Sequence, residues 1–79
     1  MTYQLYEEVV LLKDVPEKGL LKRDVVTIVE HHAMLDGEDG YSLEVFNALG
    51  DTIAVITLPQ SAITPLSKNE VFSVRALAV

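Results

Sequence analysis

Short runs of β-branched and aliphatic residues, separated by turn-forming residues, dominate this 79-residue sequence and restrict it to a β fold. The pattern predicts strands at residues 7–15, 25–31, 41–46, 52–58 and 70–77. Alternation in the second run places Val25, Thr27 and Val29 on one face and Val26, Ile28 and Glu30 on the other. No segment shows the periodicity of an amphipathic helix, so no helix competes with these strands.

Two connections complete the expected architecture. Residues 16–19 (Pro-Glu-Lys-Gly) predict a turn, and Leu20 and Leu21 predict that the following loop covers one end of the core. Residues 60–66 are too short and too proline-flanked for a helix, so we expect a single 3₁₀ turn before the last strand. The predicted fold is an all-β, small five-stranded, partly open SH3-like barrel in one domain, residues 1–79. The alternatives are an unclosed meander and a sheet completed by dimerisation.

Length and composition set further limits. A chain this short buries only about 60% of its extended surface, so its core must be efficient or be completed by a partner. The 49% hydrophobic content argues against disorder, and the absence of cysteine excludes disulfides, thiolate nucleophiles and cysteine-based metal sites. The sequence shows neither a signal peptide at its start nor an uninterrupted apolar run of about 20 residues, so we expect a cytoplasmic protein that does not bind membranes.

The negative charge is concentrated in one part of the sequence. Residues 24–67, called the acidic segment below, contain seven acidic residues and no Lys or Arg. The net charge of −6 is therefore −7 in this segment and +1 in the rest of the chain. Because nucleic acids and anionic lipids bind through Lys and Arg, we expect neither as a partner. A basic protein surface fits better, although acidic residues also keep a small apolar domain soluble.

His31 and His32 are the most obvious candidate metal ligands, because acidic residues follow them. Adjacent residues in a strand point to opposite faces, so the two imidazoles are not expected to bind one ion. The acidic loop at residues 36–40 lacks the EF-hand spacing, since glycine falls at its fifth position. We predict no specific metal site and no cofactor, and weak cation binding at this acidic tip stays open.

The sequence offers little for catalysis. None of its serines lies in a Gly-x-Ser-x-Gly turn, no phosphate-binding glycine loop is present, and Glu7 and Glu8 are adjacent rather than apposed. A domain of this size also has little room for both a core and a cleft of roughly several hundred Å³. We therefore expect a protein that is not an enzyme.

Several runs of the chain resemble a known bacterial family. They are residues 5–12 (LYEEVVLL), 14–20 (DVPEKGL), 22–30 (KRDVVTIVE), 41–46 (YSLEVF) and 50–59 (GDTIAVITLP). Together they are similar to the bacterial domain-of-unknown-function family 4926. This chain departs from the family pattern at two positions. Arg23 stands where the family usually has glycine before Asp24, and Val26 stands where it often has a second glycine.

The resemblance implies a small SH3-like barrel in a stand-alone bacterial protein, often encoded beside another short gene. It implies no activity, cofactor or site residues. The gene arrangement suggests a partner protein of antitoxin-like or immunity-like type, because a small acidic chain can steer onto a basic surface and cover it.

We therefore predict a non-enzymatic module that presents an acidic face to a basic protein partner. The predicted partner-binding residues are Glu30, Asp36, Glu38, Asp39, Glu44 and Phe46. Phe46 is out of phase with the inward residues of its strand, so it either covers a second small core or serves as an exposed anchor. The alternative is a homodimer or larger homo-oligomer with a structural or accessory role, which pairs through the apolar C-terminal strand, whose end is an apolar tail at residues 75–79.

Overall fold

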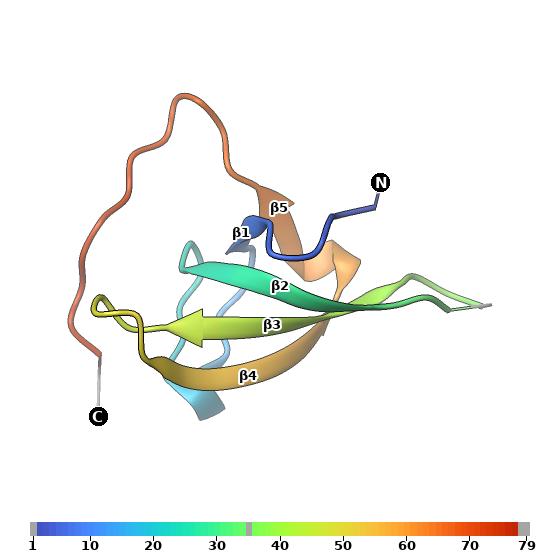
Figure 1. Cartoon of the computed structure of the whole chain (residues 1–79), viewed down its shortest axis with the longest axis horizontal. Coiled ribbons are helices and arrows are strands. Elements are labelled where there is room, and N and C mark those ends of the chain that lie inside the picture. Colours follow the sequence, from blue (N-terminus) through green and yellow to red (C-terminus); the bar gives the residue numbers. More distant parts are fainter. Residues whose placement is uncertain (1, 35, 78–79) are drawn as a thin grey trace.

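The computed structural model describes residues 2–34 and 36–77, in which five strands and two 3₁₀ turns form (Figure 1). The elements are β1 (Glu8–Leu11), η1 (Pro16–Lys18), β2 (Val25–His32), β3 (Gly40–Phe46), β4 (Thr52–Pro59), η2 (Gln60–Ala62) and β5 (Ile63–Pro65). Residues 78 and 79 of the predicted apolar tail lie outside the described residues. The all-β prediction is confirmed. The described part of the chain includes no helix with the length and hydrophobicity needed to span a membrane.

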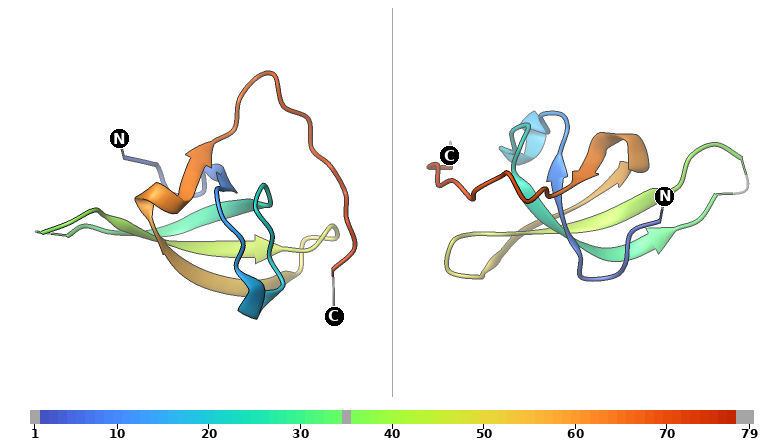
Figure 2. Two further views of the ribbon diagram at one scale, coloured as in Figure 1. Left: turned by 180° about the vertical axis from the view of Figure 1, so that it is seen from behind. Right: turned by 90° about the horizontal axis from the view of Figure 1, so that it is seen from above.

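All five strands belong to one antiparallel sheet with the order β4-β3-β2-β1-β5. β2, β3 and β4 form a meander, and the sheet curves so that β1 and β5 cross over its inner face without closing it (Figure 1). The β2–β3 hairpin projects at one end of the molecule and the β3–β4 turn at the other (Figure 2). The prediction of five strands in a partly open barrel, with a 3₁₀ turn before the last strand, is confirmed.

The core lies on the inner face of the sheet. In β3, the predicted inward residues Tyr41, Leu43 and Val45 are all buried. In β2, Val26 and Ile28 are buried opposite them. Burial of apolar side chains supplies most of the stability of a small domain. These positions are therefore expected to contribute most to the stability of the sheet.

The predicted fifth strand at residues 70–77 is wrong. The last strand is β5, which follows η2 directly and pairs with β1. Ile63 in β5 is 3% exposed and completes the core, whereas Val71 and Val74 are both 91% exposed. The alternation at residues 70–77 favours a strand, but β5 already occupies the edge of β1. Residues 70–77 therefore pair with no strand in the described part of the chain.

The connection between β1 and β2 is a compact turn that packs against the core. Gly19 ends η1 in the left-handed region, with φ 70°. Leu20 is buried, as predicted for a residue that covers the core, but Leu21 is exposed, so that part of the prediction is wrong. Arg23 has φ 83°, a conformation that is strained for an L-residue and favours glycine. Glycine, which the family that the sequence resembles usually has at this position, adopts this conformation without strain. This chain has arginine there and bears the strain.

Residues 66–77, called the C-terminal segment below, leave the sheet after β5. They loop outward and return beside the β1–β2 connection, so that the last described part of the segment lies near the β3–β4 end of the molecule (Figures 1 and 2).

Candidate functional site

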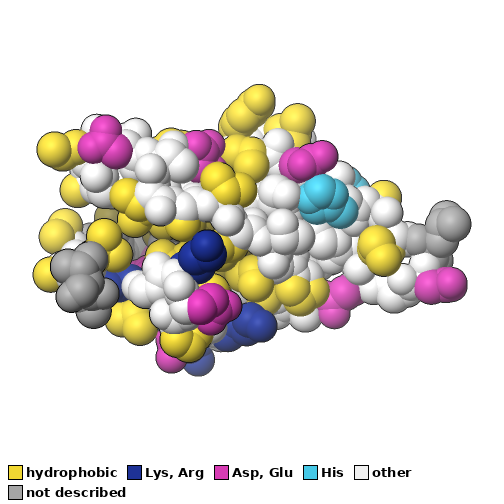
Figure 3. Space-filling model, turned by 90° about the horizontal axis from the view of Figure 1, so that it is seen from below, with side chains coloured by type: hydrophobic (Ala, Val, Ile, Leu, Met, Phe, Trp, Pro, Cys, Tyr) yellow, Lys and Arg dark blue, Asp and Glu magenta, His cyan; other side chains and the backbone are white. Residues whose placement is uncertain are grey.

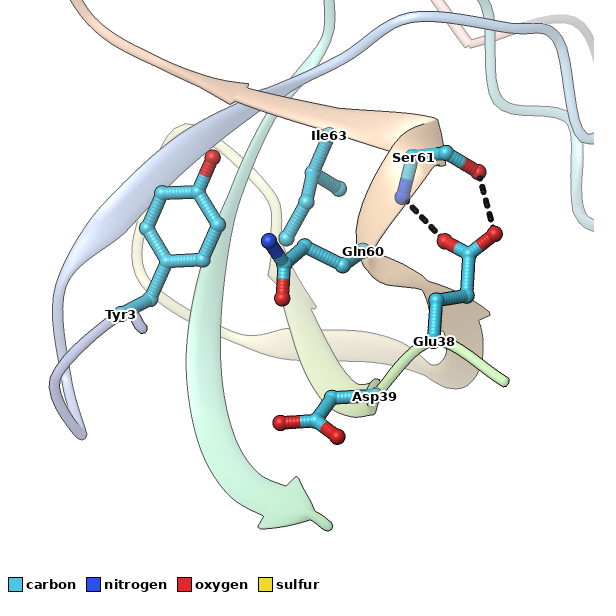
Figure 4. A pocket seen from close by; sticks show the side chains of 6 residues that line it. All are labelled: Tyr3, Glu38, Asp39, Gln60, Ser61 and Ile63. Atoms are coloured by element: carbon cyan, nitrogen blue, oxygen red, sulfur yellow. Dashed lines mark hydrogen bonds between the residues drawn. The ribbon is translucent and has the colours of Figure 1, made fainter. Parts of the chain in front are cut away.

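A shallow groove lies where the β2–β3 hairpin meets η2 (Figure 4). Its volume is about 510 Å³, and its lining residues are Tyr3, Glu38, Asp39, Gln60, Ser61 and Ile63. Pro59 ends β4 and directs the chain into η2, where the Gln60 amide donates a hydrogen bond to the Asp39 carbonyl at 2.9 Å. The groove thus brings two acidic residues of the predicted site next to polar residues of a distant part of the chain.

Glu38 ties the hairpin to η2. Its carboxylate accepts hydrogen bonds from the amide and the hydroxyl of Ser61, at 2.7 and 3.1 Å (Figure 4). A carboxylate that accepts two hydrogen bonds is fixed in position and has less capacity for a partner's Lys or Arg. Glu38 therefore has a structural role, which the sequence does not reveal.

Asp39 and His31 form a second fixed pair. The Asp39 carboxylate lies 2.7 Å from His31 Nε2 and accepts a hydrogen bond from the Met34 amide at 3.1 Å. The hydrogen bond with His31 has the larger effect and the one from Met34 the smaller, and together they hold the pKa of Asp39 below its usual value. The His31 ring also stacks on Tyr41, with ring centroids 4.9 Å apart. The Tyr41 hydroxyl accepts a hydrogen bond from the Tyr3 amide at 3.1 Å, which extends the network to the N-terminal residues.

His32 points to the opposite face, as predicted for adjacent residues of a strand. Its Nε2 lies 2.7 Å from the Ser42 hydroxyl and 3.8 Å from the Glu30 carboxylate. A nucleophilic triad needs the serine and the carboxylate on different ring nitrogens, so that the acid orients the base. Here both contacts use the same nitrogen, and 3.8 Å is too long for a hydrogen bond. These three side chains therefore do not form a catalytic triad.

The two histidines are also separated as possible metal ligands. His31 contacts Asp39 at the groove, whereas His32 contacts Ser42 on the outer face of the sheet. Within residues 2–34 and 36–77, no group of three or more His, Asp or Glu side chains is placed to hold a metal ion.

The outer face of the meander carries the remaining acidic residues of the strands. Alternation predicted Glu30 on the face of Ile28, but a register shift between these residues places Glu30 opposite Ser42. An extra residue in a strand moves the following side chains to the other face, so the prediction for Glu30 is wrong. Glu44 and Phe46 alternate with Ser42 along β3 and share its face. Glu30, Glu44 and Phe46 are thus on one surface.

Glu8 is an additional acidic residue of this face. It pairs with Thr27 of β2, which pairs in turn with Glu44 of β3. Paired residues of neighbouring strands point to the same face, and the strands are about 4.8 Å apart. Sequence reasoning missed Glu8 because it lies outside the acidic segment, and only the strand register shows that it shares the face of Glu44, with Thr27 between them.

The structure thus divides the six predicted partner-binding residues among three places. Glu38 and Asp39 line the groove, Glu30, Glu44 and Phe46 lie on the outer face, and Asp36 is exposed at the tip of the hairpin. Phe46 is 41% exposed and lies outside the buried core cluster.

Side-chain types differ between the two ends of the molecule (Figure 3). The end with the β2–β3 hairpin shows acidic side chains and histidine, whereas hydrophobic side chains gather mainly toward the β3–β4 turn and the C-terminal segment. All six Lys and Arg residues belong to the β1–β2 connection or the C-terminal segment. The hairpin end therefore carries acidic residues without Lys or Arg, whereas acidic side chains occur at both ends of the molecule (Figure 3).

Two ion pairs that the sequence does not predict join the C-terminal segment to the β1–β2 connection. Arg23 lies 3.4 Å from Glu70, and the Asp24 carboxylate accepts two hydrogen bonds from the Arg75 guanidinium. Partial burial acts to raise the pKa of Asp24, but the hydrogen bonds from Arg75 and from the Leu21 amide outweigh it, so this pKa lies below its usual value. The hydrogen bonds with Asp24 also raise the pKa of Arg75. Opposite charges are visible in the sequence, but pairing over about fifty residues is not.

Comparison with known proteins gives one result that bears on these features. The model of the family described as "domain of unknown function (DUF4926)" matches residues 5–65. No curated protein and no solved structure matches the chain significantly. The match covers all five strands, the outer face and the lining of the groove apart from Tyr3, and it ends before the C-terminal segment. The chain therefore belongs to the DUF4926 family, as its sequence runs suggested.

Proposed function

We propose that this protein is a non-enzymatic binding module whose outer sheet face binds a basic surface of a protein partner. The observation that carries the proposal is the separation of charge. Acidic residues line the meander and its hairpin, whereas every Lys and Arg belongs to the β1–β2 connection or the C-terminal segment. Such a separation speeds the encounter with a basic partner and orients it.

The outer face supports this role better than the groove does. At the groove, hydrogen bonds within the chain already engage Glu38 and Asp39. On the outer face, the Glu30 side chain is 65% exposed, and Phe46 offers an exposed aromatic ring beside the carboxylates. Aromatic residues surrounded by polar ones are frequent at the centre of protein interfaces. Asp36 extends the acidic surface toward the hairpin tip.

The kind of partner follows from the family resemblance. The resemblance implies a protein encoded beside another short gene, and on that basis we propose an antitoxin-like or immunity-like pairing with the product of the adjacent gene. The bacterial origin, the cytoplasmic location and the SH3-like classification of the barrel are part of the same proposal.

Co-expression with the product of the adjacent gene tests the proposal. We expect a stoichiometric complex whose affinity falls between low and moderate salt, because charge attraction between exposed groups is screened. Glu30→Lys and Glu44→Lys should each weaken the complex by about tenfold or more. Glu17→Lys is the matched control, since Glu17 is exposed on η1, away from the outer face. The absence of a complex, an affinity indifferent to salt, or an equal loss in all three variants would contradict the proposal.

A further inference from the structure

The C-terminal segment is held at two points by adjacent residues of the β1–β2 turn. Arg23 pairs with Glu70, and Asp24 pairs with Arg75, whose guanidinium also donates to the Gly19 carbonyl at 3.1 Å. We call these two ion pairs, together with the hydrogen bond to Gly19, the clamp. In the described part of the chain, every hydrogen bond between the segment and the rest of the protein belongs to the clamp. The clamp fixes the path of the segment without burying it.

Three of the four residues between the two ion pairs are apolar, and all three are exposed. Val71 and Val74 are 91% exposed and Phe72 is 71% exposed. Within the described residues, the backbone of residues 71–77 makes no backbone hydrogen bond. A segment held extended at both ends has lost part of its conformational freedom, so pairing with another strand costs less ordering entropy. The alternation of residues 70–77 favours a strand, but these residues pair with no strand within the described chain.

The outer edge of β4 offers the complementary feature. β4 pairs with β3 on one side only, and no hydrogen bond outside that ladder involves its backbone in the described chain. Its eight residues include no charged side chain. The opposite edge of the sheet, β5, has three residues and ends in Pro65, features that protect an edge from pairing. β4 lacks this protection along most of its length and exposes Ile53 and Val55 beside the open edge.

We propose that two copies of this chain form a dimer in which residues 70–77 of each copy add as a strand to the β4 edge of the other. The lengths agree, since both segments have eight residues and an extended segment of that length spans about 26 Å. The charges agree as well. The C-terminal segment, which includes the donor residues, and the β1–β2 connection beside it carry all six basic residues, and the acceptor strand β4 lies within the acidic segment. A reciprocal exchange also closes the assembly at two copies.

This inference goes beyond the proposed function and uses different residues. The dimer needs the β4 edge and the C-terminal segment, whereas partner binding is assigned to Glu30, Glu44 and Phe46. The chain alone, with no other protein present, tests the dimer. Either proposal can therefore fail without the other.

Sedimentation of the purified full chain at micromolar concentrations gives the first test. We expect a dimer, and we expect Val74→Asp to weaken it by at least about tenfold, because the variant places a carboxylate in the added strand. Leu49→Asp is the matched control, since Leu49 is 89% exposed and lies in the β3–β4 turn outside the paired residues. A monomeric chain, or an equal effect of both variants, overturns the proposal.

Disulfide cross-linking identifies the paired segments, because the natural chain has no cysteine. Val55→Cys is mixed with Val74→Cys and, in parallel, with Phe72→Cys, and the mixture in which the two cysteines lie opposite each other should give covalent dimers that contain one chain of each variant. Val55→Cys dimers alone would mean that two β4 edges pair with each other, which contradicts the assignment of the C-terminal segment. A double variant with Cys at 55 and 74 that cross-links only within one chain also contradicts it.

The variant Arg23→Gly distinguishes the effect of the clamp on dimerisation from its effect on the stability of the fold. The substitution removes the strained backbone at φ 83°, so the melting temperature should not fall, yet it also removes the pair with Glu70. We expect weaker dimerisation, by a few-fold, in a protein that is at least as stable. Unchanged dimerisation in this variant would show that the clamp does not prepare the segment for pairing.

Discussion

The β2–β3 hairpin and the C-terminal segment lie at opposite ends of the molecule and use their side chains differently (Figure 1). At the hairpin, the carboxylates of Glu38 and Asp39 bond to other elements, and the His31 ring rests on the buried Tyr41. In the C-terminal segment, charged side chains are bonded, but the apolar side chains between them are exposed. Carboxylates bonded within the chain, such as these two, hold the hairpin in the fold. A segment whose apolar groups are uncovered is suited to contact with another molecule.

The strongest test of this comparison replaces one aromatic residue at each end. Tyr41 is fully buried, so Tyr41→Ala should lower the free energy of unfolding by about 3–5 kcal/mol. Phe72 is 71% exposed, so Phe72→Ala should change it by less than about 0.5 kcal/mol in the monomer. Urea denaturation at low protein concentration measures both. Similar losses in the two variants would mean that the C-terminal segment packs as tightly as the hairpin.

A smaller effect is expected where the hairpin is tied to η2. Glu38→Ala removes two hydrogen bonds to Ser61, so the free energy of unfolding should fall by about 1 kcal/mol, and the Ser61 amide should exchange its hydrogen faster. Glu17→Ala serves as control, because Glu17 is exposed and distant from the groove. Unchanged exchange at Ser61 would argue that the hairpin and η2 are held together by other contacts.

Strand patterns in the sequence predict most of this fold because each strand buries one face. The alternation of Tyr41, Leu43 and Val45 places them correctly in the core, since the hydrophobic effect acts on each position of the strand. The alternation at residues 70–77 is equally clear but leads to a wrong strand. Whether a strand forms depends on a free edge beside it, and the short β5 takes that edge. Local patterns do not contain this information.

The candidate site is predictable only in part for a related reason. The opposite directions of His31 and His32 follow from the strand geometry and are confirmed by their different partners. The face of Glu30 depends on one irregular pairing after Ile28, and the contribution of Glu8 depends on the register of three strands. Registers are set by contacts across the sheet, so a reading along the chain assigns such residues to the wrong surface or omits them.

Arg23→Gly should raise stability rather than lower it. The left-handed conformation costs an L-residue about 1–2 kcal/mol, and the greater freedom of glycine in the unfolded chain offsets part of that relief. The lost pair with Glu70 is exposed and contributes little. We expect a gain of up to about 1 kcal/mol in the free energy of unfolding, measured by urea denaturation. Arg23→Ala, which keeps the strain but loses the ion pair, is the control and should be no more stable than the natural chain.

The smallest effect on stability is expected from lowering the pH, and it involves one carboxylate at each end of the molecule. Asp39 at the hairpin and Asp24 at the clamp both have a pKa below the usual value, because hydrogen bonds from His31 and from Arg75 favour their charged forms. A carboxyl group whose pKa is lower in the folded state adds stability above its unfolded pKa of about 3.9, and this stability is lost as the pH falls through the folded value.

Unfolding by urea between about pH 6 and pH 3 should therefore show stability decreasing toward the acid end, and both Asp39→Asn and Asp24→Asn should flatten this decrease. Hydrogen exchange distinguishes their locations. Acid should loosen the Met34 amide through Asp39, and the Leu21 amide through Asp24, because each carboxylate accepts a hydrogen bond from that amide. If Asp24→Asn leaves the acid dependence unchanged, the clamp does not contribute to the stability of the fold, and its role is confined to positioning the C-terminal segment.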